Sequence, residues 1–98
     1  MAKVNWTDEA EGLLRDIHDY IAADNPEAAS RTIEGIHARA DLLERFPLVG
    51  HWYVTALGRE VRILLYGHYR IAYIVRSEET VQILGVFHGA LDIDRYLL

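Results

Sequence analysis

Residues 24–29 carry the feature that most restricts the fold, a very short connection between two helical segments. The sequence there reads DNPEAA. Asn25 suits a helix N-cap, and Pro26 suits the first position of a helix, where no backbone N–H is needed. A helix that begins so soon after another one ends must fold back along it. The junction therefore predicts an antiparallel helical hairpin.

The segments on either side of this junction have amphipathic patterns. Upstream, apolar residues recur at helical spacing over residues 8–23, and the first turn fits a capping box that puts carboxylates at the positive end of the helix dipole. Downstream, apolar residues step by four and three from Ala29 to Leu43. Pro47 disfavours helical geometry in the residue before it. We therefore expect one helix over about 8–23 and a second that begins at the junction and ends near Phe46.

The second half of the chain has the β-branched and aromatic composition of strands. Three such runs are separated by Gly67 and by residues 77–79, and they read REVRILLYG, HYRIAYIVR and TVQILGVFH. We expect three consecutive antiparallel strands over residues 59–67, 68–76 and 80–88. The middle run is apolar on both faces, which is typical of a central strand.

Three shorter segments complete the expected topology. Residues 3–6, KVNW, alternate apolar and polar side chains before the first helix, as a short edge strand does. Residues 47–58 have no clean period and contain one proline and two glycines, so we interpret them as a loop, with some extended structure as an open alternative. Residues 91–97 suit one helical turn. The order strand, helix, helix, three strands predicts an α+β fold in which an antiparallel helical hairpin covers one face of a single sheet.

Composition restricts the class of protein. The chain has 98 residues, 51% of them hydrophobic, which fits a single domain over residues 1–98 with a modest core. It has no cysteine, which excludes disulfides and thiolate metal sites. No run approaches the roughly 18 apolar residues that span a bilayer, and the N-terminus lacks the charged and apolar regions of a signal peptide. We therefore expect a cytoplasmic protein with no membrane partner.

The first half of the chain carries the whole net charge of −5. Residues 1–58 have five basic and ten acidic side chains, whereas residues 59–98 have five of each. Within residues 59–76 the balance reverses, with four arginines and one glutamate. A domain that wraps nucleic acid usually has a basic surplus over its whole surface. General or sequence-specific binding of RNA or DNA is therefore not expected.

Four stretches of the chain resemble those of a known family. They are NPEAA at the helix junction, RFPLVG after the second helix, GHYRIAYIV in the middle run of the meander and VFHGALD at the end of the last strand. In this order the chain resembles the RelE/ParE superfamily of bacterial type II toxin–antitoxin systems over nearly its whole length. The resemblance implies a small toxin that a cognate antitoxin keeps inactive. RelE-like members are ribosome-dependent endoribonucleases that cut mRNA, whereas ParE-like members inhibit DNA gyrase.

The residues available for RNA cleavage separate these two branches. Attack by the 2′-OH needs one group to take its proton, another to protonate the leaving oxygen, and cations around the phosphorus. The resemblance to RelE-like toxins implies lysines and arginines on the sheet, but residues 61–64 read VRIL where lysines are expected, and residues 89–92 after the last strand read GALD. The catalytic candidates that remain are Arg62, Arg70, His88 and Tyr96.

Two of these candidates have chemistry that suits an RNA substrate. Arg70 could hold a phosphate with two hydrogen bonds, and His88 could exchange a proton near neutral pH. Two structural roles stay open beside these: Arg70 paired with a neighbouring carboxylate, and His88 hydrogen-bonded to the turn at Gly89. The missing lysines favour the ParE-like branch, which binds DNA gyrase. The alternatives are a nuclease that acts with the ribosome on mRNA, and an inactive family member that binds only its antitoxin.

We expect two protein-binding surfaces. The local positive charge on the sheet and its C-terminal end predicts target-binding residues, which are Arg59, Arg62, Arg70, Arg76 and His88. The resemblance implies an antitoxin segment that wraps the toxin as a helix and often adds a strand to the sheet edge. For the helix we expect a groove between the hairpin and the sheet, with the candidates Leu13, Ile17, Leu43, Trp52 and Tyr53, although ordinary core roles for the last two stay open. No pair of histidines has ligand spacing, so we expect neither a metal nor any other cofactor.

Overall fold

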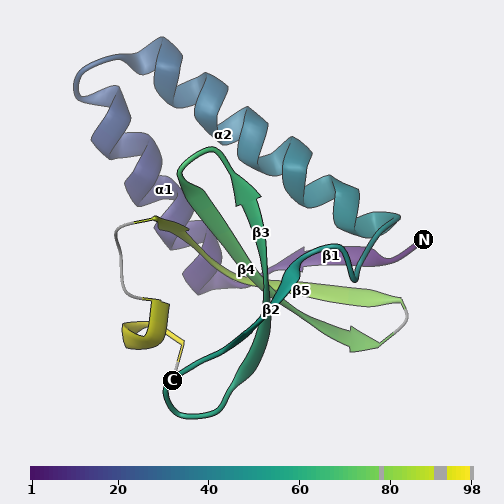
Figure 1. The fold of residues 1–98 in the computed structure, drawn as a ribbon. Coiled ribbons are helices and arrows are strands. Elements are labelled where there is room, and N and C mark those ends of the chain that lie inside the picture. Colours follow the sequence, from purple (N-terminus) through teal and green to yellow (C-terminus); the bar gives the residue numbers. More distant parts are fainter. Residues whose placement is uncertain (78, 90–92, 98) are drawn as a thin grey trace.

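The computed structural model describes residues 1–77, 79–89 and 93–97 (Figure 1). In chain order the elements are β1 (Lys3–Trp6), α1 (Asp8–Ala22), α2 (Pro26–Asp41), the 3-10 helix η1 (Leu42–Glu44), β2 (His51–Val54), β3 (Glu60–Tyr66), β4 (Tyr69–Ser77), β5 (Thr80–His88) and the 3-10 helix η2 (Ile93–Arg95). The predicted α+β fold, with an N-terminal strand, a helical hairpin and a three-stranded meander, is confirmed. The helical turn expected over residues 91–97 is present as η2, and residues 91 and 92 lie outside the described residues.

Helix α1 is capped by Thr7 and helix α2 by Asn25, and of these two caps the sequence predicts Asn25. The hydroxyl oxygen of Thr7 accepts a hydrogen bond from the Ala10 N–H at 3.0 Å, and the side-chain oxygen of Asn25 accepts one from the Ala28 N–H at 3.0 Å. Pro26 occupies the first turn of α2, as expected. The two helices pack against each other as an antiparallel pair (Figure 1). In the described part of the chain, no helix is long and apolar enough to cross a membrane.

The strands form one sheet in the order β1-β5-β4-β3-β2. From β2 to β5 each strand pairs antiparallel with the next in sequence, whereas β1 runs parallel to β5. β4 therefore lies in the middle of the sheet and β1 at an edge, as the sequence predicts. β1 pairs only with the first half of β5, from Thr80 to Ile83. Among the described residues, no strand lies beside the outer side of the second half of β5.

Residues 51–54 form the edge strand β2, where we expected a loop from the sequence. β2 pairs antiparallel with β3, and His51 lies opposite Ile63 at one end of the pairing. Four residues are too few to show a period of two, and such a short strand depends on the neighbour with which it pairs. The loop interpretation is therefore wrong for these four residues, and the open alternative of extended structure is correct.

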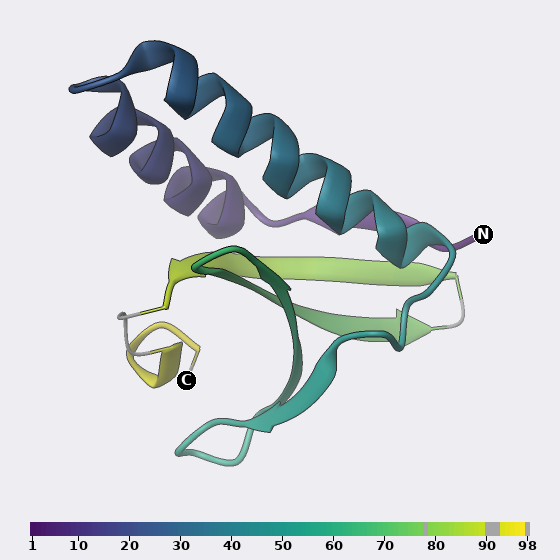
Figure 2. The same cartoon turned by 45° about the horizontal axis from the view of Figure 1, so that its top comes forward.

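The sheet has an apolar core on each face. The first core lies between the sheet and the helices, and its fully buried members are Ala10, Ile36, Ala40, Leu43, Ile71, Tyr73, Val81 and Ile83. The second core lies on the opposite face and contains Val61, Ile63, Ala72, Leu84, Phe87, Ile93 and Leu97. Its last two members belong to the C-terminal segment, which lies on the side of the sheet away from the helices (Figure 2). The sheet is thus covered by the hairpin on one face and by the C-terminal segment on the other.

Asp94 attaches this C-terminal segment to the β2–β3 hairpin. Its Oδ2 atom accepts a hydrogen bond from the Tyr53 hydroxyl at 3.0 Å, and its Oδ1 atom accepts one from the Ala56 N–H at 2.7 Å. Hydrogen bonds to a charged carboxylate are stronger than those between neutral groups. Asp94 therefore fixes the C-terminal segment against the second core, and Tyr53 has a structural role there.

Tyr73 attaches residues 47–50 to the face of the sheet that the helices cover. Its hydroxyl donates a hydrogen bond to the Pro47 carbonyl oxygen at 2.8 Å and accepts one from the Gly50 N–H at 2.8 Å. Burial raises the pKa of Tyr73, while the Gly50 hydrogen bond and the charge of Arg62 oppose this rise. The hydroxyl therefore stays protonated at neutral pH and can act as both donor and acceptor. Tyr73 therefore helps to hold the segment before β2 in position.

We expect Tyr73→Phe to lower the free energy of unfolding by about 1–3 kcal/mol, because the Pro47 carbonyl and the Gly50 N–H would lose their partner while remaining shielded from water. Urea unfolding monitored by circular dichroism measures the change in the free energy of unfolding. Tyr20→Phe is the matched control, because Tyr20 is 85% exposed and its substitution should change the stability by less than about 0.5 kcal/mol. Equal stability of Tyr73→Phe and the wild-type protein would contradict the role assigned to Tyr73.

Candidate functional site

A groove of about 510 Å³ lies between α1 and the end of the sheet formed by β4 and β5. We call it the α1 groove, and its lining residues are Leu13, Asp16, Ile17, Tyr20, Ile21, Tyr69, Val86, His88 and Tyr96. Most of these side chains are apolar or aromatic. Tyr20 is 85% exposed and Tyr96 is 51% exposed. The α1 groove is therefore an apolar surface that is open to solvent.

The apolar stripe of α1 is wider than the area of the sheet against which the helix packs. The part of the stripe that stays uncovered forms one wall of the α1 groove. Leu14 faces the sheet and is buried, whereas Ile17 is only partly buried and Tyr20 is exposed. The groove lies over Val86 and His88, in the half of β5 that β1 does not reach. Among the described residues, no strand pairs with the outer side of this half of β5, so the groove beside α1 stays open there.

A second depression of about 420 Å³ extends the α1 groove toward the face that carries the second core. The two share Leu13, Asp16 and Tyr96, so they form a continuous surface along α1. The charged side chains that line this surface are Asp16, Glu9 and Arg15, so two of the three are carboxylates. An apolar floor with an acidic rim suits a partner segment that carries apolar side chains and at least one cation.

Tyr69 and His88 lie opposite each other at the sheet end of the α1 groove. They are cross-strand partners, and their rings pack edge to face with centroids 5.5 Å apart. Burial raises the pKa of Tyr69, and Tyr20 adds to the rise. The Tyr69 hydroxyl is therefore protonated at neutral pH and is not a candidate general base. His88 is the last residue of β5, as the sequence predicts, and it lies beside an aromatic ring at the mouth of the groove.

The structure does not bring the four catalytic candidates into one site. His88 and Tyr96 both line the α1 groove. Arg70 follows Tyr69 in β4, and its side chain lies on the opposite face because successive strand residues alternate. Arg62 lies in a different pocket on β3 and donates hydrogen bonds to two backbone carbonyl oxygens. Among the described residues, no group of three or more His, Asp or Glu side chains could hold a metal ion.

The predicted target-binding residues do not form one patch. Arg70 and Arg76 are six residues apart on β4, which corresponds to roughly 20 Å in an extended strand. By the strand register, Arg59, Arg62 and Arg76 lie toward one end of the sheet, whereas Arg70 and His88 lie at the other. The expectation of a single positive cluster is therefore wrong. Within the described ranges, neither Arg59 nor Arg70 has a side-chain hydrogen bond or an ion pair, so the alternative of an Arg70–carboxylate pair is not found there.

The predicted antitoxin-binding residues are also divided between separate surfaces. Leu13 and Ile17 line the α1 groove. Leu43 is fully buried in the first core, so its expected place on an open surface is wrong. Trp52 and Tyr53 lie on β2, at the edge of the sheet opposite β1.

Sequence reasoning missed several residues of the α1 groove. Tyr20 and Ile21 continue the three- and four-residue spacing from Leu13 and Ile17, so their position on the same side of α1 could have been found. Tyr69 and Val86 come from strands, and only the register of β4 against β5 places them beside α1.

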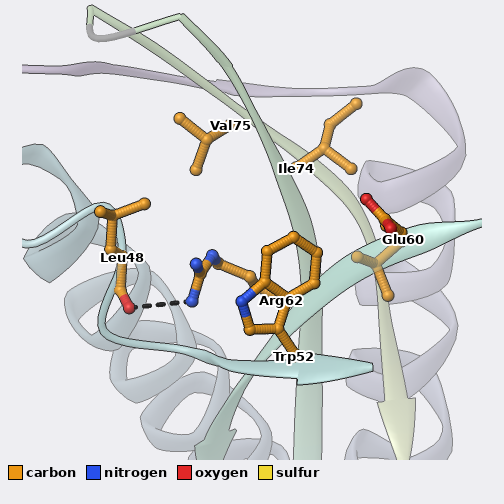
Figure 3. Close-up of a pocket in the computed structure, with 7 residues that line it drawn as sticks. Leu48, Trp52, Glu60, Arg62, Ile74 and Val75 are labelled. Carbon is orange, nitrogen blue, oxygen red and sulfur yellow. Dashed lines mark hydrogen bonds between the residues drawn. The ribbon is translucent and has the colours of Figure 1, made fainter. Parts of the chain in front are cut away.

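A separate pocket of about 300 Å³ lies beside β2 (Figure 3), and we call it the Trp52 pocket. The guanidinium carbon of Arg62 lies 4.7 Å from the centroid of the Trp52 ring, a cation–π distance. The Nη1 atom of Arg62 donates to the carbonyl oxygens of Leu48, at 3.1 Å, and Gly50, at 2.7 Å. Figure 3 shows Arg62 between Leu48 and Trp52, with Glu60 nearby. Arg62 therefore has a structural role, yet it keeps a positive charge beside an exposed indole.

This fold occurs in a solved structure of a bacterial toxin–antitoxin system. One chain of a solved structure described as the chromosomal ParDE TA system from P. aeruginosa is similar, with a TM-score of 0.71 and 22% sequence identity over 90% of this chain and 96% of that chain. A search of the curated proteins finds no match. The model of the family "ParE toxin of type II toxin-antitoxin system, parDE" matches residues 4–93. The chain therefore belongs to the ParE toxin family.

Proposed function

We propose that this ParE-family toxin inhibits DNA gyrase by binding to it in the cytoplasm, and that a cognate antitoxin neutralises it. Membership of the ParE family over residues 4–93 is the observation that carries the proposal. Gyrase is the target that the resemblance to ParE-like toxins implies. The related solved structure is described as a ParDE TA system, which supports an antitoxin partner for this chain.

The distribution of cations supports binding rather than catalysis. RNA cleavage needs cations and proton-transfer groups within hydrogen-bond reach of one phosphate. Arg70 lies on the face of the sheet opposite His88, and Arg62 is bonded to the loop before β2. The chain is therefore better suited to inhibit a target protein by contact than to cut mRNA on the ribosome.

The α1 groove is the surface that we assign to the antitoxin. An amphipathic helix buries apolar side chains at a spacing of three or four residues in such a groove. Ile17 and Tyr20 would contact its apolar face, and Asp16 at the rim would attract a lysine or arginine. An exposed tyrosine that becomes buried on binding is a frequent source of affinity in protein interfaces.

Assays with purified components test the proposed target. We expect the protein to inhibit supercoiling by DNA gyrase at low molar excess, to leave mRNA on programmed ribosomes intact, and to cause filamentous growth with DNA-damage signalling when its expression is induced. Addition of the antitoxin encoded beside the toxin gene should restore supercoiling. The Arg70→Ala variant should inhibit gyrase as well as the wild-type protein does, because Arg70 lines neither the α1 groove nor the Trp52 pocket.

Two other results would replace the proposal. Cleavage of mRNA at the ribosome that is lost in both His88→Ala and Arg70→Ala would identify an mRNA endoribonuclease. Unchanged growth on induction, together with unchanged gyrase activity, would identify a family member that binds only its antitoxin.

A further inference from the structure

The segment from residue 46 to residue 57 exposes an unusual share of large apolar side chains. Eleven large hydrophobic residues are exposed in the described part of the chain, and six of them belong to this segment. They are Phe46, Leu48, Val49, Trp52, Val54 and Leu57, with exposed fractions between 56% and 75%. We call this set the β2 edge surface. A concentration of exposed apolar groups along one edge indicates a surface that another protein covers.

The backbone of β2 adds main-chain hydrogen-bonding groups to this surface. β2 is the last strand of the sheet, so its outer side has no strand partner among the described residues. The Thr55 N–H donates to the Arg59 carbonyl oxygen at 2.9 Å, which places this residue pair at a hydrogen-bonded position of the antiparallel ladder. Because N–H directions alternate along a strand, the N–H groups of Trp52 and Val54 point away from β3. These two groups can pair with an added strand.

The charge of this region differs in sign from that of the whole chain. Residues 45–62 contain three arginines, Arg45, Arg59 and Arg62, and one acidic residue, Glu60. Their net charge is +2 in a chain whose net charge is −5. Arg62 stacks on the Trp52 ring, so one of these charges is held directly beside the exposed indole (Figure 3). The region therefore attracts an acidic segment, whereas the acidic rim of the α1 groove attracts a basic one.

The same charges argue against a second copy of this chain as the partner. Two copies that paired through β2 around a two-fold axis would bring their arginines toward each other. Like charges across an interface are unfavourable, and two β2 strands of four residues would form only a short ladder. An acidic segment of a different protein meets neither difficulty.

We propose that an extended acidic segment of the target protein docks on the β2 edge surface by strand addition. The added strand pairs with the outward N–H groups of Trp52 and Val54, its apolar side chains contact the exposed indole, and its carboxylates face Arg59 and Arg62. This inference rests on the proposed function, in which the target is DNA gyrase. It assigns gyrase and the antitoxin to opposite edges of the sheet.

Proline substitution at an outward-facing position tests strand addition directly. Val54→Pro removes an N–H group that points away from β3, so the β2–β3 ladder keeps its own hydrogen bonds, and proline is tolerated at such edge positions. Val54→Thr is the matched control, because it keeps the N–H and the β-branched shape. We expect Val54→Pro to weaken binding to purified gyrase by about tenfold or more in surface plasmon resonance, and Val54→Thr to change it by less than about threefold.

A charge reversal tests the acidic character of the partner segment. Arg59→Glu should weaken gyrase binding by about tenfold at low ionic strength, and the difference should shrink as salt is added. Arg31→Glu is the control, because Arg31 is an exposed arginine on α2 outside both surfaces. If Val54→Pro does not fold, Arg59→Glu remains as the test. The Arg59 side chain has no hydrogen-bonded partner among the described residues, so its replacement breaks no such bond there.

The possible results separate this inference from the proposed function. Wild-type binding to gyrase that Val54→Pro and Arg59→Glu leave unchanged would overturn the docking surface and keep gyrase as the target. The absence of any wild-type binding to gyrase would overturn both. A concentration-dependent dimer in analytical ultracentrifugation that Val54→Pro abolishes would overturn the inference by identifying a second copy as the occupant.

Discussion

Tyr20→Glu is expected to lower the affinity of the toxin for its antitoxin by about a hundredfold, the scale of a central hot-spot residue in a protein interface. Tyr20 is 85% exposed in the α1 groove, so its substitution removes no buried contact of the folded toxin. A bound helix would cover the ring and remove it from water. The substitution removes that contact and adds a negative charge near Asp16 and Asp19. The new carboxylate at position 20 would face the apolar side of the partner. Isothermal titration calorimetry with the proposed cognate antitoxin measures the change.

Ser30→Glu is the matched control for Tyr20→Glu. Ser30 is exposed on α2 and does not line the α1 groove, and the two substitutions change the net charge equally. We expect Ser30→Glu to bind the antitoxin within about threefold of the wild-type protein, since isolated surface charges contribute little. If both variants bind the antitoxin equally well, the antitoxin does not use the α1 groove. If both bind equally poorly, net charge rather than the groove determines the affinity.

The sequence predicted the parts of the fold that depend on near neighbours. The Asn25 cap, the helical hairpin and the central position of β4 follow from residue type and spacing within a few residues. The strand β2 could not be predicted in the same way, because its four residues become a strand only through pairing with β3. The local sequence pattern therefore predicts the helices and the three strands of the meander. The second edge of the sheet depends on long-range strand pairing.

The candidate site shows the same division between local and long-range information. Helical spacing placed Leu13 and Ile17 on one side of α1, and the structure finds both in the α1 groove. The arginines are close in the sequence, but a strand extends by about 3.3 Å per residue, so Arg70 and Arg76 are well separated on β4. Periodicity showed that Leu43 faces inward but did not show its depth, and it is buried completely. Exposure of an apolar residue depends on what packs over it, which the sequence alone does not give.

Phe87→Ala should lower the free energy of unfolding by about 3–5 kcal/mol, because a fully buried phenylalanine leaves a cavity that the surrounding side chains fill only in part. Phe87 is 0% exposed, and its ring lies 5.5 Å from that of Tyr96, centroid to centroid. The packing around it is tight: a Cβ atom placed on Gly85 would lie 2.6 Å from the Phe87 ring. Since domains of this size are commonly stable by about 5–15 kcal/mol, the variant should unfold at much lower urea concentrations.

The chain offers one matched control for this substitution, since Phe46 is its other phenylalanine. Phe46 is 57% exposed, so Phe46→Ala should change the stability by less than about 1 kcal/mol. If Phe87→Ala does not fold, Phe87→Leu should fold with a smaller loss in the free energy of unfolding.

Phe87 also lines the depression that extends the α1 groove, together with Leu13 and Tyr96. If the proposed function and docking surface hold, Phe87→Leu should therefore weaken antitoxin binding through a displaced Tyr96 ring and leave gyrase binding at the β2 edge surface unchanged. Equal losses for both partners would mean that the two edges of the sheet do not act separately.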